Sequence, residues 1–152
     1  MNLLKVDEVI GDYSGRSRSV LDYCLVMERM MVQSKESGFN RNSWAPLADL
    51  VDVEQFERIG NFKEVMDWKG YLDFLTSWAM GSEWECSFKR ITELGNIVFL
   101  ELEERARIDD FANVVDSISV YEFNEAEKIC HVDVYLQMEP LPADIHDAIE
   151  TP

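Results

Sequence analysis

Apolar and polar residues alternate along four long segments in the second half of the chain. These segments are 83–94, 97–108, 111–123 and 129–138. A period of two residues is that of a β-strand with one buried face, and short links between such segments favour hairpins. The links contain Gly95-Asn96, Asp109-Asp110 and Asn124-Glu125. The pattern therefore predicts an antiparallel meander of four long strands, preceded by a shorter strand at 51–56.

In the first half of the chain, apolar residues recur with the spacing of an α-helix. An apolar stripe recurs every three or four positions and consists of Val20, Tyr23, Cys24, Met27 and Met31. It predicts an amphipathic helix over 19–36, with Ser17 or Ser19 as its N-terminal cap. A short helix opens at Ser43, and Asp67 can cap a further helix that ends near Gly81.

The order of these elements indicates the fold class. Helices first and a sheet afterwards predict an α+β fold, with N-terminal helices packed on one face of a curled antiparallel sheet. The length of 152 residues suits a single domain over 1–152. We expect residues 1–17 to form an N-terminal extension and residues 139–152 to form an acidic tail.

The chain is strongly acidic. Thirty acidic residues against fourteen basic ones give a net charge of −16, which repels phosphate backbones and disfavours nucleic-acid partners. No run approaches the roughly 18 apolar residues that a membrane span requires, and the first residues lack the pattern of a signal peptide. We therefore expect a cytoplasmic protein with no membrane partner.

Cysteine and histidine usage gives no sign of a metal. Cys24, Cys86 and Cys130 lie far apart in the sequence and fit neither a disulfide framework nor a CxxC motif. The two histidines, His131 and His146, are too few for a histidine-based metal site. Buried thiols are the simplest interpretation of the cysteines, and we expect no metal and no cofactor.

The strand phases suggest which side chains face inward. Even-numbered positions are the more apolar in all four strands, and residues directly opposite each other project to the same face. Glu104 and Asp116 are carboxylates in this inward phase, and a turn centred on residue 110 would place them opposite each other. Two close carboxylates cannot both ionise easily, so the pair could supply a general acid or base. Alternatively, Arg90 neutralises one of them, or both lie at a rim without chemistry.

The last strand, ICHVDVYLQM, carries a row of polar side chains. His131, Asp133 and Tyr135 share the odd phase, while the apolar residues of the strand share the even one. The odd phase is predicted to face outward, where the row would suit solvent or a homodimer contact.

Four stretches carry a resemblance to a known family: PLADLVDVEQF, WKGYLDFLTSWA, VFLELEER and VYEFNEAEKICHVDVYLQ. Over 18–138 the chain resembles the SnoaL-like branch of the nuclear-transport-factor-2-like (NTF2-like, cystatin-like) superfamily. The resemblance implies a cone-shaped sheet curled around a helix-capped apolar pocket, with an outer sheet face often used for dimers. The family includes isomerases, polyketide cyclases, dehydratases, epoxide hydrolases and non-catalytic binders.

The chain departs from the catalytic patterns of this family. It is similar to limonene-epoxide hydrolases in the run 101–128, but it has Leu102 in place of an arginine, Glu104 in place of an aspartate and Val134 in place of a second aspartate. Against ketosteroid isomerases, Gln55 stands where the aspartate base lies and Ser119 where the proton-donating acid lies.

The last strand can also be aligned with the family in a second register. HVDVYLQMEP resembles the HWDV-type ending of some SnoaL-like proteins. A one-residue gap in this match would put Asp133 in the pocket, with His131 beside it.

Two functions follow as hypotheses. In the first, the chain binds a small apolar molecule and, if it is an enzyme, catalyses cofactor-free proton transfer, isomerisation, dehydration or water addition. Glu104 would be the acid or base, Asp116 would tune it, and Gln55 would orient a substrate oxygen or water. The expected pocket residues are Val53, Gln55, Trp68, Tyr71, Trp84, Phe88, Leu102, Ile118 and Val134. In the second, the chain is a non-catalytic ligand-binding or dimeric assembly module.

Overall fold

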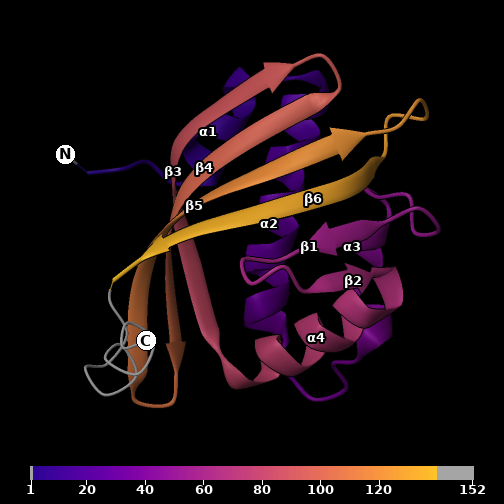
Figure 1. Cartoon of the computed structure of the whole chain (residues 1–152). Helices are drawn as coiled ribbons and strands as arrows, with labels where there is room; N and C mark the ends of the chain where they lie inside the picture. The colour runs from indigo at the N-terminus through magenta and orange to yellow at the C-terminus, as the bar shows by residue number, and fades with distance from the viewer. Residues whose placement is uncertain (1, 140–152) are drawn as a thin grey trace, which may run out of the picture.

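Six strands form one curved sheet, and helices cover its concave face (Figure 1). The structure is a computed structural model that describes residues 2–139. The strands are β1 (Glu57–Ile59), β2 (Val65–Asp67), β3 (Glu83–Leu94), β4 (Ile97–Ile108), β5 (Phe111–Phe123) and β6 (Ile129–Met138), in the spatial order β2-β1-β6-β5-β4-β3. All neighbours are antiparallel except β1 and β6, which are parallel. The predicted α+β class and the four-strand meander are confirmed, and the complete sheet is mixed.

The helices precede the long strands. They are α1 (Val6–Val9), η1 (Ile10–Asp12), α2 (Gly15–Gln33), η2 (Arg41–Trp44), α3 (Ala45–Ala48) and α4 (Trp68–Gly81). Figure 1 shows α2 behind the long strands, with α4 below it. The core lies between α2 and the sheet, where Leu21 and Leu100 are almost completely buried. None of the helices within residues 2–139 is long and apolar enough to cross a membrane.

Helix α2 begins four residues before the predicted start. Ser17 is not its cap, because it lies inside the first turn and donates both its N–H and its hydroxyl to Oε1 of Glu93, at 3.0 and 2.7 Å. A carboxylate at this end satisfies amides that have no partner within the helix and complements the helix dipole. Residues distant in sequence therefore cap the helix. At α4, by contrast, Asp67 caps as predicted, since its Oδ1 accepts the N–H of Gly70 at 2.8 Å.

The predicted strand at 51–56 is wrong. Only Val51 forms a bridge, to Ile129 of β6, and the chain then bends. Oδ1 of Asp52 accepts the backbone N–H groups of residues 54 and 55, each at 3.1 Å, which closes a local turn. The first strand, β1, consequently forms at Glu57–Ile59.

The predicted inward phase of β5 is also wrong. The hairpin turn contains two residues, Asp109 and Asp110, so that Ile108 pairs with Phe111. The predicted turn was centred on residue 110 alone. The observed pairing is therefore shifted by one residue along β5, and a shift of one residue turns every side chain of the strand to the other face. Odd positions of β5 therefore face inward, namely Val115, Ser117, Ser119 and Tyr121, and even positions face outward.

A bulge changes the phase of β3. The pairing with β4 shifts between Phe88 and Arg90, leaving Lys89 as the extra residue. Arg90 then faces outward and forms an ion pair with Glu101. It therefore does not neutralise Glu104, as one alternative had suggested.

The N-terminal residues add to the edge of the sheet. Leu4 forms a bridge with Phe88 of β3, whose N–H donates to the Leu4 carbonyl oxygen at 2.7 Å. Apart from residue 139, the expected acidic tail lies outside the described residues.

Candidate functional site: an aromatic cavity with one carboxylate

A cavity of about 280 Å³ lies between the inner face of the sheet and helices α2 and α4. Its lining is mainly apolar and aromatic. The lining residues are Tyr23, Cys24, Met27, Arg58, Tyr71, Phe74, Leu75, Trp78, Trp84, Leu102, Glu104, Ala106, Asn113, Val115, Ser119, Tyr121, Val132, Val134, Leu136 and Met138. Phe74 and Met138 are each about two-fifths exposed, so they lie at the mouth of the cavity.

Glu104 brings a negative charge into this lining. It lies on β4 between Leu102 and Ala106, which face the same side. The indole N–H of Trp84 donates to Oε1 of Glu104 at 2.9 Å, which fixes the position of the carboxylate. No side chain or amide within residues 2–139 donates to the other oxygen, Oε2, which can therefore accept from a ligand or a water molecule.

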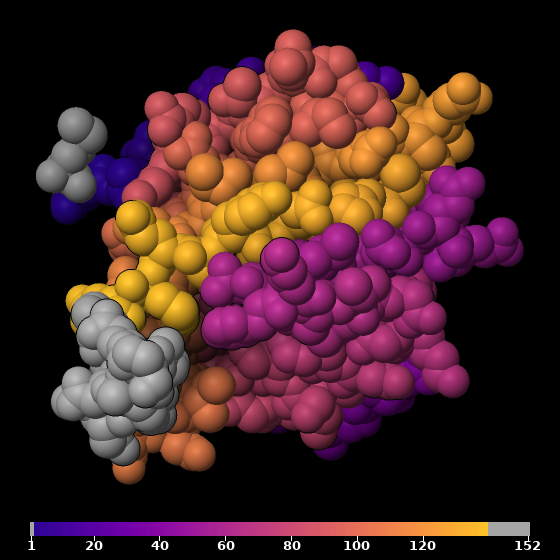
Figure 2. Space-filling model, viewed as in Figure 1, coloured from indigo at the N-terminus to yellow at the C-terminus, as the bar shows by residue number. Residues whose placement is uncertain are grey.

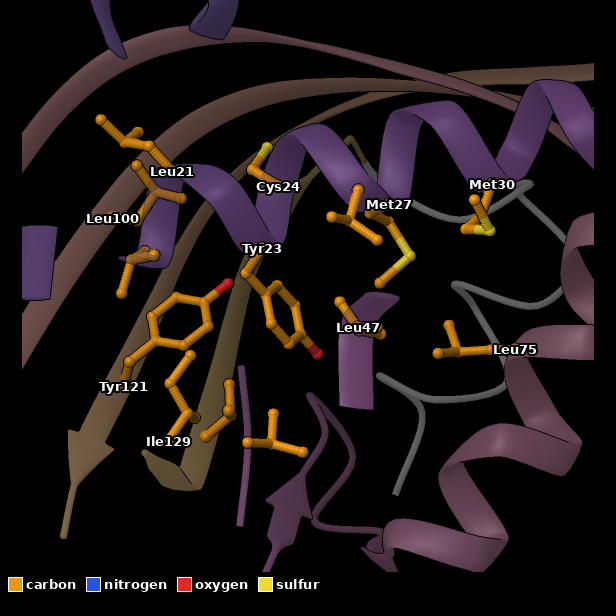
Figure 3. Close-up of a cluster of buried hydrophobic side chains, with 14 of the residues drawn as sticks. Leu21, Tyr23, Cys24, Met27, Met30, Leu47, Leu75, Leu100, Tyr121 and Ile129 are labelled. Atoms are coloured by element: carbon orange, nitrogen blue, oxygen red, sulfur yellow. The ribbon is translucent and has the colours of Figure 1, made fainter. Parts of the chain in front are cut away.

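Three buried tyrosines form one wall. The hydroxyl of Tyr23 donates to that of Tyr71 at 3.0 Å, and the ring of Tyr23 meets Tyr121 edge-on, with centroids 5.5 Å apart. Figure 3 shows Tyr23 and Tyr121 side by side beneath α2. Burial raises the pKa of all three phenols, and it raises those of Tyr23 and Tyr121 well above the usual value. At neutral pH these hydroxyls are therefore neutral hydrogen-bond donors and acceptors.

Arg58 of β1 supplies the positive charge of the cavity. Its Cζ lies 5.1 Å from the ring centroid of Tyr71 and 6.0 Å from that of Phe74, within the range of cation–π attraction. The guanidinium lowers the pKa of Tyr71, although burial outweighs this effect. The cavity thus combines one carboxylate and one guanidinium with an aromatic wall.

Four of the predicted pocket residues line the cavity: Tyr71, Trp84, Leu102 and Val134. The others lie elsewhere. Trp68 is buried beside the cavity and packs edge-on against Phe56, and Phe88 packs against Tyr13.

The remaining three predicted pocket residues are exposed. Val53 and Gln55 lie in the bend that follows Val51, where Oε1 of Gln55 accepts from Asn124 at 3.3 Å. Ile118 is 40% exposed on the outer face, because the phase of β5 differs from the prediction.

Asp116 is not the neighbour of Glu104. Glu104 pairs with Val115, whereas Asp116 faces outward and forms an ion pair with Lys89 at 2.5 Å. The predicted carboxylate pair is therefore wrong, for the same reason as the phase of β5.

Asp133 and His131 lie together on the outer face, as their odd phase predicted. Nε2 of His131 is 3.0 Å from Oδ1 of Asp133, and Nδ1 lies 3.3 Å from Glu57. Val132 and Val134, on either side of Asp133, line the cavity instead. The second register, which would place Asp133 in the pocket, is not the one in the structure.

Sequence reasoning missed several cavity residues. Phe74 and Trp78 follow Tyr71 at helical spacing, so a wider stripe on α4 could have identified them. No pattern in the sequence pointed to Arg58, because it lies in a strand of three residues that follows a bend that was not predicted. Ser119 and Tyr121 were missed through the phase of β5.

The structure brings two distant cysteines together. Sγ of Cys24 on α2 lies 3.4 Å from Sγ of Cys86 on β3, and both side chains are buried, as expected. Cys130 is partly buried and lies at a bulge in β6. Burial and the hydrogen bond with Cys24 raise the pKa of Cys86, the hydrogen bond more strongly.

Solved structures share this architecture. An NTF2-like protein of unknown function from Exiguobacterium sp. 255-15 aligns with 78% of the chain and 98% of its own length, at 9% identity and a TM-score of 0.63. The chain has the NTF2-like fold. An LEH-like epoxide hydrolase from M. tuberculosis aligns over 73% and 83% of the two chains, at 12% identity and a TM-score of 0.55. A candidate SnoaL-like polyketide cyclase from Jannaschia sp. CCS1 aligns over 83% and 93%, at 11% identity and a TM-score of 0.54. No protein-family model matches the sequence, and no curated protein matches it significantly.

Proposed function

We propose that the chain binds a small, largely apolar molecule in the central cavity and that Glu104 acts on it as a general acid or base. The observation that carries this proposal is the position of Glu104. It is the one carboxylate among the described residues that line the cavity, and Trp84 holds it at 2.9 Å. Structures with this fold include an LEH-like epoxide hydrolase and a candidate polyketide cyclase, which agrees with chemistry in this cavity.

The volume of the cavity limits the size of the molecule. A cavity of about 150 Å³ in an engineered protein core holds one benzene. The cavity here measures about 280 Å³, so we infer a molecule of one or two rings or a compact terpenoid chain. The aromatic wall contributes apolar contact, and the polar groups orient the molecule.

Proton transfer needs no cofactor in such a site. Oε1 of Glu104 accepts from Trp84, and Oε2 can take a proton from the molecule or from a water beside it. The neutral hydroxyl of Tyr71 and the guanidinium of Arg58 can stabilise negative charge that develops on a substrate oxygen. Isomerisation, dehydration and water addition each require only these positioned groups.

The test compares two neighbouring glutamates. Small apolar alcohols, ketones and epoxides would be screened by ligand-detected NMR and then assayed for turnover. Glu104→Gln is expected to lower turnover by about 10²–10⁴-fold, the usual contribution of a general acid or base. Glu103→Gln is the control, since residue 103 lies next to it on the outer face, paired with Arg105. Equal turnover in the two variants would contradict the role of Glu104.

Ligand binding can be tested separately from chemistry. Val134 lies on the cavity wall, so Val134→Phe is expected to fill part of the volume and to abolish ligand binding. A variant that binds the same molecules with unchanged affinity would show that they bind elsewhere.

We propose as a second function that the outer sheet face joins two copies of the chain. Figure 2 shows this face, where β6 lies between β5 and the β1–β2 segment. Ile118 and Tyr135 pair across β5 and β6 there and are 40% and 60% exposed. Ile118→Glu with Tyr135→Glu should convert a dimer into a monomer in sedimentation analysis. Phe62→Glu is the control, because Phe62 is 80% exposed in the turn between β1 and β2. A monomeric unmodified protein would refute this second function.

We further propose the cytoplasm as the compartment, with no nucleic-acid partner. The three cysteines are free, which suits a reducing environment, and the net charge of −16 repels phosphate backbones. Fluorescence microscopy of the tagged protein would test the compartment, and a diffuse intracellular signal is expected.

A further inference from the structure

Three metal-ligating side chains meet where α2 crosses β3. They are Cys24, Glu28 and Cys86, and one ligand atom from each lies within 4.8 Å of the other two. Cys24 and Glu28 are four residues apart on α2 and so share one side of the helix. Cys86 comes from an inward position of β3 and is completely buried. Figure 3 shows Cys24 leaving α2 on a different side from Tyr23.

We propose that these three side chains bind one thiophilic divalent metal ion, with Zn²⁺ as the ion that fits best. Two thiolates select soft or borderline ions over Mg²⁺ and Ca²⁺, which prefer oxygen ligands. A carboxylate completes three protein ligands, and a fourth tetrahedral position is left for water. Both thiols release their protons to the buffer when the ion binds.

The distances agree with a tetrahedral ion. Zn–S bonds of about 2.3 Å and Zn–O bonds of about 2.1 Å place two sulfurs about 3.8 Å apart, and a sulfur and an oxygen about 3.6 Å apart. Here the two Sγ atoms are 3.4 Å apart, and Sγ of Cys86 is 3.2 Å from Oε1 of Glu28. Each of these two pairs needs to separate by only a few tenths of an ångström, and Sγ of Cys24 lies within 4.8 Å of the Glu28 carboxylate.

The charges around the cluster are of both signs. Lys5 acts on Glu28 as a positive charge, and Asp7 and Glu85 act on it as negative charges. Lys5 is in turn paired with Glu85 at 3.4 Å. Burial excludes competing water from the two sulfurs, whereas the half-buried Glu28 gives an ion a path from solvent.

Cobalt gives a direct readout of thiolate ligation. The full chain, kept reduced, would be titrated with Co²⁺ and followed by its thiolate-to-cobalt charge-transfer absorption. We expect this band to saturate at one ion per chain and to disappear when Zn²⁺ is added. Cys24→Ser and Cys86→Ser should each abolish it, and Glu28→Gln should weaken binding at least about tenfold. Cys130→Ser is the matched control and should keep the band, because Cys130 lies on β6, outside the cluster.

Thermal unfolding provides a second test in case the Cys24→Ser or Cys86→Ser variant fails to fold. Zn²⁺ at about 100 times its dissociation constant should raise the Tm of the unmodified chain by about 5–10 °C. Glu28→Gln changes a half-buried side chain, so it should fold, and a tenfold loss of affinity should remove about half of this shift at the same Zn²⁺ concentration. Cys24 also lines the cavity, and Cys86 pairs with Glu104 across β3 and β4, so Glu104 is the residue to exclude as a ligand. Glu104→Gln should keep the cobalt band, which distinguishes metal binding from the proposed chemistry at Glu104.

Three outcomes would overturn the proposal. The first is the absence of a thiolate band in the unmodified protein at saturating Co²⁺. The second is a band that survives in folded Cys24→Ser or depends on Cys130. The third is a disulfide between Cys24 and Cys86 in the reduced preparation, detected by mass spectrometry, which would assign the pair to redox chemistry.

Discussion

Alkaline pH should unfold the protein through its buried tyrosines. Tyr23, Tyr71 and Tyr121 are 4%, 5% and 6% exposed, and burial raises the pKa of each phenol above its usual value near 10. In the unfolded chain the same phenols ionise near pH 10. Above that pH the folded state holds more protons than the unfolded state, so the free energy of unfolding falls as the pH rises.

The rate at which the free energy of unfolding falls with pH depends on the number of phenols that stay protonated in the folded state. Each contributes about 1.4 kcal/mol per pH unit, and Tyr23 and Tyr121, whose pKa values are raised furthest, together give about 2.7 kcal/mol per unit. Tyr71 adds to this until it ionises. Two pH units above 10 therefore remove about 5 kcal/mol, which is the lower end of typical domain stability.

Urea unfolding at several pH values above about 9 measures this slope. Tyr121→Phe should reduce it by about 1.4 kcal/mol per pH unit, because one protonated phenol is lost from the core. Tyr135→Phe is the control and should change this slope much less, since the Tyr135 side chain is 60% exposed, whereas the three core tyrosines are at most 6% exposed. An equal slope in Tyr121→Phe and the unmodified protein, or tyrosinate absorbance from these phenols without unfolding, would refute the reasoning.

Three further predictions concern stability. Leu100→Ala should destabilise the protein by about 2–5 kcal/mol in urea unfolding, because Leu100 is 1% exposed in the core. Asp109→Gly should raise the Tm by about 1–4 °C, since Asp109 has φ of 54°, which glycine adopts without strain. Asp110→Gly removes the same charge at a negative φ and should give no gain. Arg90 lowers the pKa of Glu101, so their contribution is present above about pH 4.5 and is lost on acidification below it. Glu101→Gln should flatten this acid dependence in thermal unfolding measured at a series of pH values.

Local signals sufficed for the regular elements. The four long strands were predicted with the bounds that the structure has, because their period of two and their turn residues are both local. The start of α4 was predicted because Asp67, the residue before the helix, accepts the N–H of Gly70 only three residues along the chain. At 51–56 the same reasoning failed, since the side chain of Asp52 competes with strand pairing for nearby amides.

The site itself depends on contacts between distant residues. Cys24 and Cys86 are 62 positions apart, so no spacing rule could have paired them. Arg58 reaches the cavity only because the bend after Val51 sets β1 beside β6. Glu104 was the exception, because a charged residue in an otherwise apolar phase is visible in the sequence.

The position of Ser119 shows how one turn residue decides the site. The phase argument placed Ser119 outside, whereas the resemblance to ketosteroid isomerases aligned it with an acid inside their pocket. In the structure Ser119 lines the cavity, because the two-residue turn at Asp109 and Asp110 pairs it with Leu100. The same register moves Asp116 to the outer face, so among the described cavity residues Glu104 has no second carboxylate with which to share a proton. The proposed acid–base chemistry therefore rests on a single carboxylate held by Trp84, with neutral hydroxyls around it, rather than on a coupled pair.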